Sequence, residues 1–308
     1  MSPADERVPL EDRVVIVTGA GSGLGRAYAT ALAQAGARLV VVGRRRDPLL
    51  ALVAELAGAA VPVIGDVAEP AVADRIVETA TSSFGRLDAL VNNAGGLRDR
   101  TLLNMSDSEF DEVIRAHVYG TFYVSRACAR AMRAAGGGTI VNIGSDSGLL
   151  GAFGQSNYAT AKGAILGLTL TWARELRRYG ITCNCVLPNA LTAMTENLPE
   201  LLSEYRYGPP EAFPRSMGEP SEVAPLIVLL ITERWRCLTG RLLGVGGDRL
   251  SLWQPPSERR VAFLHGGWSL GELDRSLADA LGLERPAPPD IDSNIQRGSR
   301  CRYTQLSN

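Results

Sequence analysis

Short apolar runs rich in β-branched residues alternate with stretches of helical apolar spacing through most of this chain. Runs that are apolar on both sides fit strands buried on both faces, and the helices between them allow the strands to run parallel. The runs are Arg13–Thr18, Arg38–Val42, Val61–Gly65, Leu87–Asn93, Gly138–Ser145, Ile181–Leu187 and Arg241–Val245. The helical stretches are Gly23–Ala35, Pro48–Ala57, Pro70–Phe84, Asp107–Ala135, Asn157–Tyr179 and Ser221–Ile231. This alternation predicts an α/β fold with a seven-stranded, doubly wound parallel sheet covered by helices on both faces.

The alternating pattern ends at Asp248, and the sequence beyond it changes in character. We expect residues 1–248 to form a single domain, residues 249–285 to be a C-terminal appendage packed on it, and the polar, Pro-rich residues 286–308 to be a disordered tail. Within the appendage, Gly271–Leu283 has the spacing of one short amphipathic helix. Trp253 and Trp268 could anchor the appendage over a neighbouring subunit, or the appendage could only cover the sheet edge.

The composition argues against several kinds of partner. The 308 residues carry a formal net charge of -1, which gives no electrostatic reason to expect nucleic acid or an anionic membrane. The first residues are too polar for a secretory signal peptide, and no apolar run approaches the roughly 18 residues of a membrane span. The five cysteines match neither a metal site nor a disulfide framework. We therefore expect a cytoplasmic protein that binds no metal.

The first strand leads directly into "TGAGSGLGRA", in which glycines at 19, 21, 23 and 25 open the first helix. Glycines let the backbone turn tightly and approach a pyrophosphate, whose charge the free N–H groups of a helix start would hold. Glycines alone are weak evidence, but between a strand and a helix at the start of an alternating fold they are strong evidence. The turn therefore predicts a Rossmann-type domain that binds a dinucleotide.

The spacing from Thr18 to Gly25, T-G-x-x-x-G-x-G, resembles that of the short-chain dehydrogenase/reductase family. The resemblance extends to "GDV" at Gly65–Val67 and "NNAG" at Asn92–Gly95, and it covers Arg13 to about Asp248. In that family these segments line the cofactor cleft. The resemblance implies an NAD(P) site formed by Gly19, Gly21, Ser22, Gly23, Leu24, Gly25, Arg44, Asp66, Val67, Asn93, Ala94, Gly95, Tyr158, Lys162, Pro188 and Thr192. Asp66 could equally cap the helix that begins near Pro70.

The end of the second strand bears on the choice between NADP(H) and NAD(H). An acidic side chain there would bind the adenosine ribose and repel a 2′-phosphate, but this chain has Gly43 followed by Arg44, Arg45 and Arg46. A guanidinium suits a phosphate, so we favour NADP(H) with Arg44 as its contact. NAD(H) stays the alternative, because Ser22 stands where NADP-preferring relatives often carry a basic residue. The arginines could also be a solvated surface run.

The stretch "NYATAKGA" places Tyr158 and Lys162 four residues apart on a helical segment, where positions i and i+4 are neighbours. In the family that this chain resembles, the tyrosine is the general acid/base and the lysine is its electrostatic partner. A serine thirteen residues before the tyrosine, here Ser145, binds the substrate oxygen in that family. We expect the ammonium and the charge of the nicotinamide to lower the pKa of Tyr158 well below its usual value of about 10.

His117 stands in "AHVYGTF", where many relatives carry an asparagine that holds a water for proton relay. The histidine could relay protons, titrating near neutrality, or it could be a buried structural residue. Hydroxyacyl-CoA dehydrogenases of the family resemble this chain in that histidine and in "NNAGGLRDR", Asn92–Arg100. The similarity indicates 3-hydroxyacyl thioesters or bulky ring ketones as substrates. Pro188-Asn189 replaces the usual Pro-Gly, and residues 192–216 are the expected substrate lid.

These observations predict an NADP(H)-dependent oxidoreductase that interconverts a ketone and a secondary alcohol by hydride transfer. One alternative is an NAD-dependent dehydrogenase of 3-hydroxyacyl thioesters or hydroxysteroid-like alcohols. Another is a regulator that binds the cofactor without turnover. Members of the family commonly assemble through their two long helices, so the resemblance also implies a homotetramer or homodimer that acts on a small carbonyl or alcohol substrate.

Overall fold

The computed structural model describes residues 10–191, 215 and 217–282. In this part of the chain one sheet contains the strands β1 (Val14–Thr18), β2 (Arg38–Gly43), β3 (Ala60–Ile64), β4 (Ala89–Asn92), β5 (Gly138–Ile143), β6 (Ile181–Pro188), β7 (Leu242–Gly246) and β8 (Arg249–Trp253). Their order is β3-β2-β1-β4-β5-β6-β7-β8. The first seven strands run parallel, and β8 pairs antiparallel with β7.

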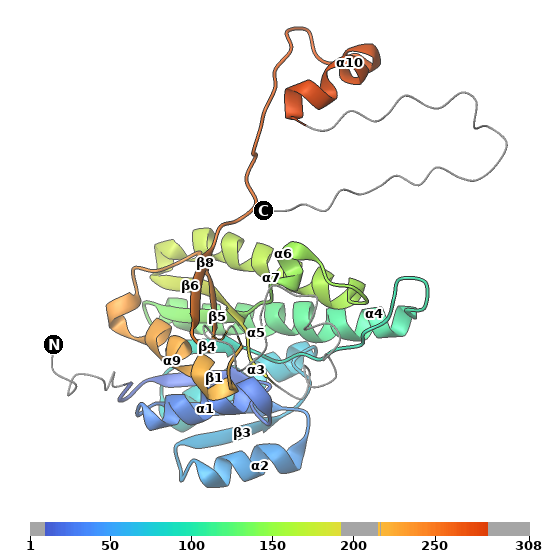
Figure 1. The fold of residues 1–308 in the computed structure, drawn as a ribbon. Helices are drawn as coiled ribbons and strands as arrows, with labels where there is room; N and C mark the ends of the chain where they lie inside the picture. Colours follow the sequence, from blue (N-terminus) through green and yellow to red (C-terminus); the bar gives the residue numbers. More distant parts are fainter. Residues whose placement is uncertain (1–9, 192–214, 216, 283–308) are drawn as a thin grey trace. The chain divides into compact units, whose positions relative to one another are not determined.

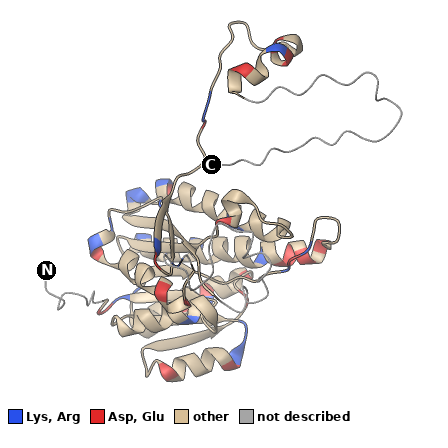
Figure 2. Ribbon diagram, in the orientation of Figure 1, with Lys and Arg blue, Asp and Glu red and all other residues tan. Residues whose placement is uncertain are grey.

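Helices cover both faces of the sheet (Figure 1), each over its own apolar core. One face carries α1 (Gly23–Gln34), α2 (Arg46–Glu55) and α9 (Pro220–Ile231), and the other carries α3 (Pro70–Phe84), α5 (Gly120–Ala134) and α7 (Ser156–Glu175). Figure 2 shows charged residues mainly on helices and loops, whereas the strands are almost free of them. The predicted α/β, doubly wound fold is therefore confirmed.

The sheet has one strand more than the sequence pattern predicted. β7 and β8 are joined by the two-residue turn Gly247–Asp248, since Gly246 is paired with Arg249, and Gly247 has a φ of +54°. β8 exposes both of its leucines, Leu250 and Leu252, to solvent, so it lacks the buried apolar run of the other strands. β8 thus belongs to the sheet although it falls within the predicted appendage.

The described residues after Gln254 belong to a second unit. It contains α10 (Leu270–Leu281), which confirms the amphipathic helix predicted near this position. Ser269 caps α10 by accepting a hydrogen bond from the Glu272 amide. The packing of the appendage on the domain stays a prediction, and the predicted tail lies outside the described residues.

The long helix predicted over Asp107–Ala135 is interrupted in the structure. It consists of α4 (Asp107–Ile114), a π-helical turn η2 (Arg115–Tyr119) and α5. A π turn inserts one residue into the hydrogen-bonding pattern and is often found at functional sites. The middle residue of η2 is His117, so the π turn lies at the residue that the sequence indicated as a possible proton relay.

A buried chain of polar side chains links the two central strands to helices α5 and α7. Asn92 Nδ2 donates to Ser125 Oγ at 2.7 Å and to Asn142 Oδ1 at 2.9 Å, and Asn142 Nδ2 donates to Thr169 Oγ1 at 2.9 Å. All four residues are buried. The bonds fix α7, which carries Tyr158 and Lys162, relative to the middle of the sheet.

We expect Asn142→Ala to lower the free energy of unfolding by about 2–4 kcal/mol, because Asn92 and Thr169 would lose a partner while staying buried. Urea unfolding followed by circular dichroism measures this loss. Asn104→Ala is the control, since Asn104 bonds only Thr101 at the exposed surface and should cost about 0.5 kcal/mol or less. Equal effects of the two substitutions would contradict the prediction.

Candidate active site

The glycine-rich turn between β1 and α1 packs directly against the segment that follows β4. Gly19 has a φ of +66°, and a β-carbon on it would stand 2.8 Å from the Cα of Ala94. Gly25 is still more tightly enclosed, since a β-carbon there would stand 2.2 Å from the Gly19 carbonyl oxygen. The close approach of two backbones therefore requires glycine at both positions.

Thr18 and Asn93 join these two segments by hydrogen bonds. Thr18 Oγ1 accepts from the amides of Asn93 and Ala94, each at 3.0 Å. Asn93 Nδ2 donates to the carbonyls of Thr18 at 3.1 Å and Gly19 at 3.3 Å. The chain leaves β1 and β4 toward opposite faces of the sheet, so the junction lies at the topological switch point where α/β folds bind ligands.

The start of α1 offers room for the pyrophosphate of a dinucleotide. Ser22 is its N-cap residue but makes no side-chain cap, and a β-carbon on Gly23 would meet no atom within 4 Å. Gly21 and Leu24 complete this turn, with Gly21 beside Pro48 at the start of α2. An uncapped helix N-terminus next to the switch point fits a negatively charged group well.

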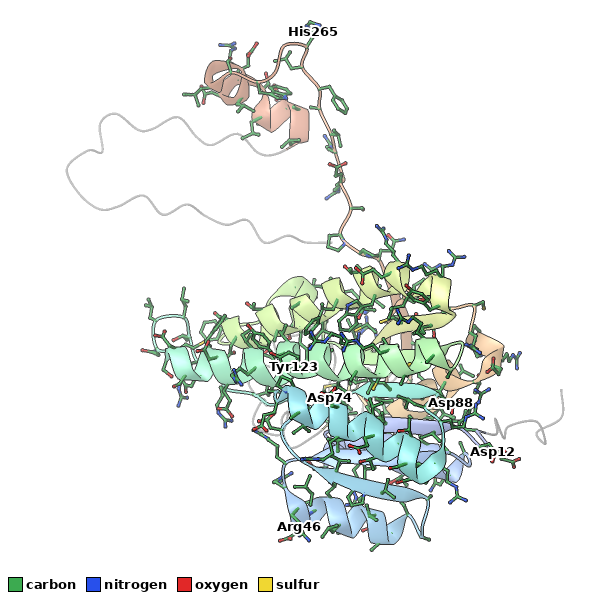
Figure 3. The ribbon with its side chains drawn as sticks, turned by 180° about the vertical axis from the view of Figure 1, so that it is seen from behind. Asp12, Arg46, Asp74, Asp88, Tyr123 and His265 are labelled. Atoms are coloured by element: carbon green, nitrogen blue, oxygen red, sulfur yellow. The ribbon has the colours of Figure 1, made fainter. Side chains whose placement is uncertain are left out.

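Two arginines flank the site where β2 ends. Arg44 Nη1 lies 4.0 Å from Asp66 Oδ2, and Arg45 Nη2 donates to Ser22 Oγ at 3.0 Å. Arg46 begins α2 and is exposed (Figure 3). Arg44 therefore reaches the segment after β3 and Arg45 reaches the glycine-rich turn, whereas Arg46 is exposed.

Asp66 and Val67 follow β3 beside these arginines. Asp66 Oδ1 accepts from the amide of Ala68 at 2.9 Å. The N-cap of α3 is Glu69, so Asp66 does not cap that helix as the alternative interpretation had it. Val67 is buried and would collide with a β-carbon on Gly120, at 2.5 Å. These contacts hold the segment after β3 against α5.

Tyr158 and Lys162 lie one turn apart on α7, with the lysine the more deeply placed. Only 4% of Lys162 is exposed, its Nζ donates to the carbonyl of Ile143 at 2.7 Å, and Nζ lies 5.4 Å from the centre of the Tyr158 ring. Burial lowers the pKa of Lys162 to about 8, so most of the lysine is still charged at neutral pH. The predicted i, i+4 pairing is present in the structure.

The Tyr158 hydroxyl is harder to ionise in the protein alone than an exposed phenol. Burial raises its pKa to about 12, a hydrogen bond with Ser145 acts in the opposite direction, and the negative charges of Asp146 and Asp99 raise it further. The expected lowering assumed both the lysine and a bound nicotinamide. Without the nicotinamide, desolvation dominates.

Ser145 follows β5 and faces Tyr158. Its Oγ donates toward Ser147 Oγ at 3.2 Å and Asp146 Oδ1 at 3.3 Å, and it accepts from the Ser147 amide at 3.2 Å. Ser145, thirteen residues before the tyrosine, is the side chain whose hydrogen bonding lowers the pKa of Tyr158. Ser145, Tyr158 and Lys162 therefore converge at the carboxyl end of the sheet, next to the glycine-rich turn.

His117 is buried at 4% exposure, with its ring edge-on to Tyr158 at 5.4 Å between ring centres. Its Nε2 lies 2.9 Å from the carbonyl oxygen and 3.1 Å from the amide nitrogen of Gly96. A β-carbon on Gly95 would overlap the imidazole, at 1.9 Å. Burial, and next the charge of Lys162, lower the pKa of His117 to about 3. The ring is therefore neutral at pH 7 and does not titrate near neutrality.

The segment after β6 is held without the glycine that relatives carry. Pro188 ends β6, the Asn189 amide donates to the Val245 carbonyl at 2.8 Å, and the Asn189 carbonyl accepts from Gly218 at 3.0 Å. Thr192 and nearly all of the predicted lid lie outside the described residues. The roles predicted for Pro188 and Thr192 thus stay predictions.

Four residues around the site were not singled out from the sequence as site residues. Asp99, Asp146 and Gln155 lie near Ser145, and the fully buried Asn157 accepts from the Tyr158 amide at 2.7 Å. Asn157 Nδ2 also donates to the carbonyls of Arg98 at 2.8 Å and Glu109 at 3.2 Å. The only available signal was proximity to the motifs, because the contacts of Asp99, Gln155 and the Asn157 amide nitrogen join residues far apart in the chain.

The fold and this cluster define a class of protein, a Rossmann-type oxidoreductase with a serine, tyrosine and lysine beside a nucleotide cleft. A family model described as short chain dehydrogenase matches residues 13–202. The chain belongs to this short-chain dehydrogenase/reductase family and is an NAD(P)-dependent oxidoreductase.

Individual relatives cover most of the chain. Hydroxyacyl-CoA dehydrogenase ChsB1 of Mycobacterium tuberculosis is 38% identical over 305 residues, which are 94% of each chain. The 3-oxoacyl-(acyl-carrier-protein) reductase FabG of Thermotoga maritima is 36% identical over 244 residues, 77% of this chain and 98% of the reductase. A crystal structure of a short chain dehydrogenase from Mycobacterium avium superposes with a TM-score of 0.78 at 37% identity, covering 90% of this chain and 97% of that one.

The described residues lack two features. None of their helices combines the length and apolar character needed to cross a membrane. No group of three or more histidine, cysteine, aspartate or glutamate side chains in that part of the chain is placed to hold a metal ion.

We expect His117 to make the folded protein sensitive to mild acid. The unfolded chain takes up a proton at this residue near its ordinary pKa of 6.5, whereas the folded protein does so only near 3, so stability falls as the pH drops below about 6.5. Relative to His117→Asn, the wild type should lose about 1.4 kcal/mol for each pH unit between pH 6 and 5. Urea unfolding at pH 7, 6 and 5 measures this, with exposed His265→Asn as the control. A constant difference between wild type and His117→Asn at all three pH values would refute the assignment.

Proposed function

We propose that this enzyme interconverts a ketone and a secondary alcohol with NADP(H), and that Tyr158 is its general acid/base. The observation that carries the proposal is the convergence of Ser145, Tyr158 and the buried Lys162 beside the glycine-rich turn. A binder without turnover has no use for a phenol and an ammonium in this arrangement. Bound nicotinamide would supply or accept the hydride.

The residues of the chain divide the remaining work among them. The hydroxyls of Ser145 and Tyr158 lie together, so both can hold the oxygen of a substrate. Tyr158 donates its proton to that oxygen in reduction and takes it back in oxidation. Lys162 keeps a positive charge next to the phenol, and it would hold the ribose of the nicotinamide. His117 is neutral at pH 7. In its proposed relay role, the imidazole would accept a proton at one ring nitrogen and release one from the other.

The preference for NADP(H) over NAD(H) is proposed on the arginines after β2. Gly43 leaves no carboxylate at the strand end, while Arg44 and Arg45 reach toward Asp66 and Ser22. Arg45 places a cation on Ser22, at the position where NADP-preferring relatives carry a basic side chain. Because a 2′-phosphate carries negative charge, two guanidinium groups here favour it.

The substrate class is proposed from the relatives. ChsB1 is named for hydroxyacyl-CoA and FabG for 3-oxoacyl groups on a carrier protein. Both names describe a thioester with oxygen on its third carbon, so we propose such a thioester as the substrate. We also propose the homodimer or homotetramer that the family resemblance implies, formed through the two long helices.

Tyr158→Phe should lower kcat for reduction of acetoacetyl-CoA by about 10²- to 10⁴-fold, because the acid that protonates the product oxygen is gone. Binding of NADPH, measured by fluorescence titration, should change little. Tyr123→Phe on α5 is the matched control (Figure 3) and should keep full activity. Undiminished reduction by Tyr158→Phe would rule out the proposed role of the phenol.

Arg44→Ala should weaken NADPH binding about tenfold and leave NADH binding nearly unchanged, since a charge-assisted bond to the 2′-phosphate is lost. Dissociation constants for the two cofactors measure the ratio. Arg46→Ala, which removes a neighbouring arginine at the start of α2, should leave it unchanged. Tighter binding of NADH than NADPH by the wild type would instead support the NAD-dependent alternative.

A further inference from the structure

The two edges of the sheet differ in how they are protected. β3, at one end, carries Pro62 in the middle of the strand, paired with Val41 of β2. A proline has no N–H to offer, and proteins use it to keep an edge strand from pairing with another chain. β8, at the other end, contains no proline. Of the two edges in the described residues, only that of β3 therefore carries such a block.

The backbone of β8 has polar groups that point away from β7. Gly246 and Arg249 flank the two-residue turn of the hairpin, and a tight turn of this kind closes by hydrogen bonding between the flanking residues. Bonded and non-bonded pairs alternate along an antiparallel ladder, so every second residue from Arg249 onward bonds to β7. The N–H and C=O groups of Leu250 and Leu252 therefore point to the other side of the strand. Within the described part of the chain, β8 is paired with β7 alone.

The side chains of β8 that face solvent are apolar. Leu250 is 71% exposed and Leu252 is 62% exposed, and they lie on the same face of the sheet as Val245 and Leu243, the residues paired with them. The charge on the strand is that of Arg249, at its first residue. An exposed apolar edge strand of this kind is a template for pairing with another strand.

The hairpin is held in place by contacts within its own chain. The Asp248 amide in the turn donates to the Arg215 carbonyl at 2.7 Å, and the Arg215 amide donates to Asp248 Oδ2 at 2.8 Å. Arg215 Nη2 donates to Glu222 Oε1 on α9 at 2.7 Å. Ser251 packs closely on β7, since a β-carbon on Gly244 would stand 2.4 Å from its oxygen. A strand fixed in this way loses little conformational freedom when it pairs with a partner.

The sequence of β8 is complementary to itself when two copies run antiparallel about Ser251. Leu250 then lies opposite Leu252 of the second copy, and these two residues can exchange both main-chain hydrogen bonds. Arg249 lies opposite Trp253 of the second copy, which keeps like charges apart and places a cation beside an indole. Within one chain the guanidinium carbon of Arg249 already lies 5.9 Å from the centre of the Trp253 ring, so both side chains are on the same face of the sheet.

Other registers fit this strand less well. A shift of one residue sets the outward main-chain groups of Leu250 against groups that bond to β7. A shift of two residues sets a leucine opposite Asp248 or Gln254 in place of a leucine. The register about Ser251 therefore satisfies both the main chain and the side chains.

We propose that β8 is an interface at which two copies of this chain pair antiparallel about Ser251 and join their sheets edge to edge. A two-fold axis through the interface brings the same residues together from both copies, as in most homodimers. This contact is separate from the association through the two long helices proposed above, and the two contacts together close a tetramer. The interface depends on neither the cofactor nor the substrate proposed above.

Leu250→Lys/Leu252→Lys tests the interface, because it places ammonium groups opposite one another across the axis. Both side chains are exposed, so the variant should stay folded, which far-UV circular dichroism checks. We expect the mass measured by sedimentation equilibrium to fall to half that of the wild type. Ala51→Lys/Ala54→Lys is the matched control. It adds the same charge at exposed positions of α2, toward the β3 end of the sheet (Figure 1), and should leave the mass unchanged.

A cysteine on the axis tests the register. Antiparallel pairing makes the two copies of Ser251 a non-bonded pair with α-carbons about 4.5 Å apart, close enough for a disulfide. In a background of Cys237→Ser and Cys301→Ser, we expect Ser251→Cys to form a covalent dimer under mild oxidation, seen on a non-reducing gel. Leu250→Cys is the control, because its two copies are diagonal at about 7–8 Å and should cross-link far less.

Three results would overturn the proposal. A wild type that sediments as a monomer, or a double lysine variant that keeps the mass of the wild type, would exclude the interface. A halved mass without a cross-link through Ser251→Cys would exclude the pairing of β8 with itself. If the double lysine variant does not fold, the cross-link decides alone. Failure of the enzyme to use NADPH or acetoacetyl-CoA would contradict the proposed function and leave the meaning of both measurements unchanged.

Discussion

The structure depends on the contact between the glycine-rich turn and the segment after β4. Thr18 and Asn93 satisfy each other's backbone groups across the switch point, and Gly19 and Gly25 let the two backbones approach to distances that exclude any side chain. The same contact performs two tasks. It closes the carboxyl-terminal end of the sheet between β1 and β4. It also leaves the first amides of α1 without a side-chain cap.

Burial then determines the chemistry of the cluster beside this contact. Desolvation raises the pKa of Tyr158, lowers that of Lys162 and lowers that of His117 much further, so the charges of the proposed site are all made less stable than in water. Of these three side chains, only Lys162 is charged at neutral pH. The protein alone therefore stores a protonated phenol next to an ammonium, a state suited to giving a proton and unsuited to taking one.

Much of this arrangement could be predicted from the sequence, because the decisive features are local. The alternation of strands and helices, the glycine spacing after β1 and the i, i+4 pair on α7 each lie within one short segment. The family resemblance supplied the serine, which the structure places against Tyr158. The strand β8 was missed although Gly247-Asp248 is a favourable hairpin turn, because the runs before it had all been parallel strands joined through helices.

What could not be predicted depends on contacts between residues far apart in the chain. The π turn at His117 leaves no mark in the apolar spacing, which continues through it. The bond from Gln155 to Asp99 joins residues 56 positions apart, and no periodicity reports it. The expected lowering of the pKa of Tyr158 considered the charges of the lysine and of a bound nicotinamide, whereas the extent of burial that opposes it is a property of the packed protein.

The direction of a hydroxyl bond is a property of the whole chain of donors and acceptors to which it belongs. Ser145 has one proton, and it is claimed from one side by Ser147 and Asp146 and from the other by Tyr158 when that residue ionises. A network that ends in a carboxylate draws protons toward that end, because the carboxylate can offer none in return. The hydroxyl of Ser145 is therefore shared between its polar neighbours and the buried phenol, and the balance between them belongs to the packed site and not to Ser145 alone.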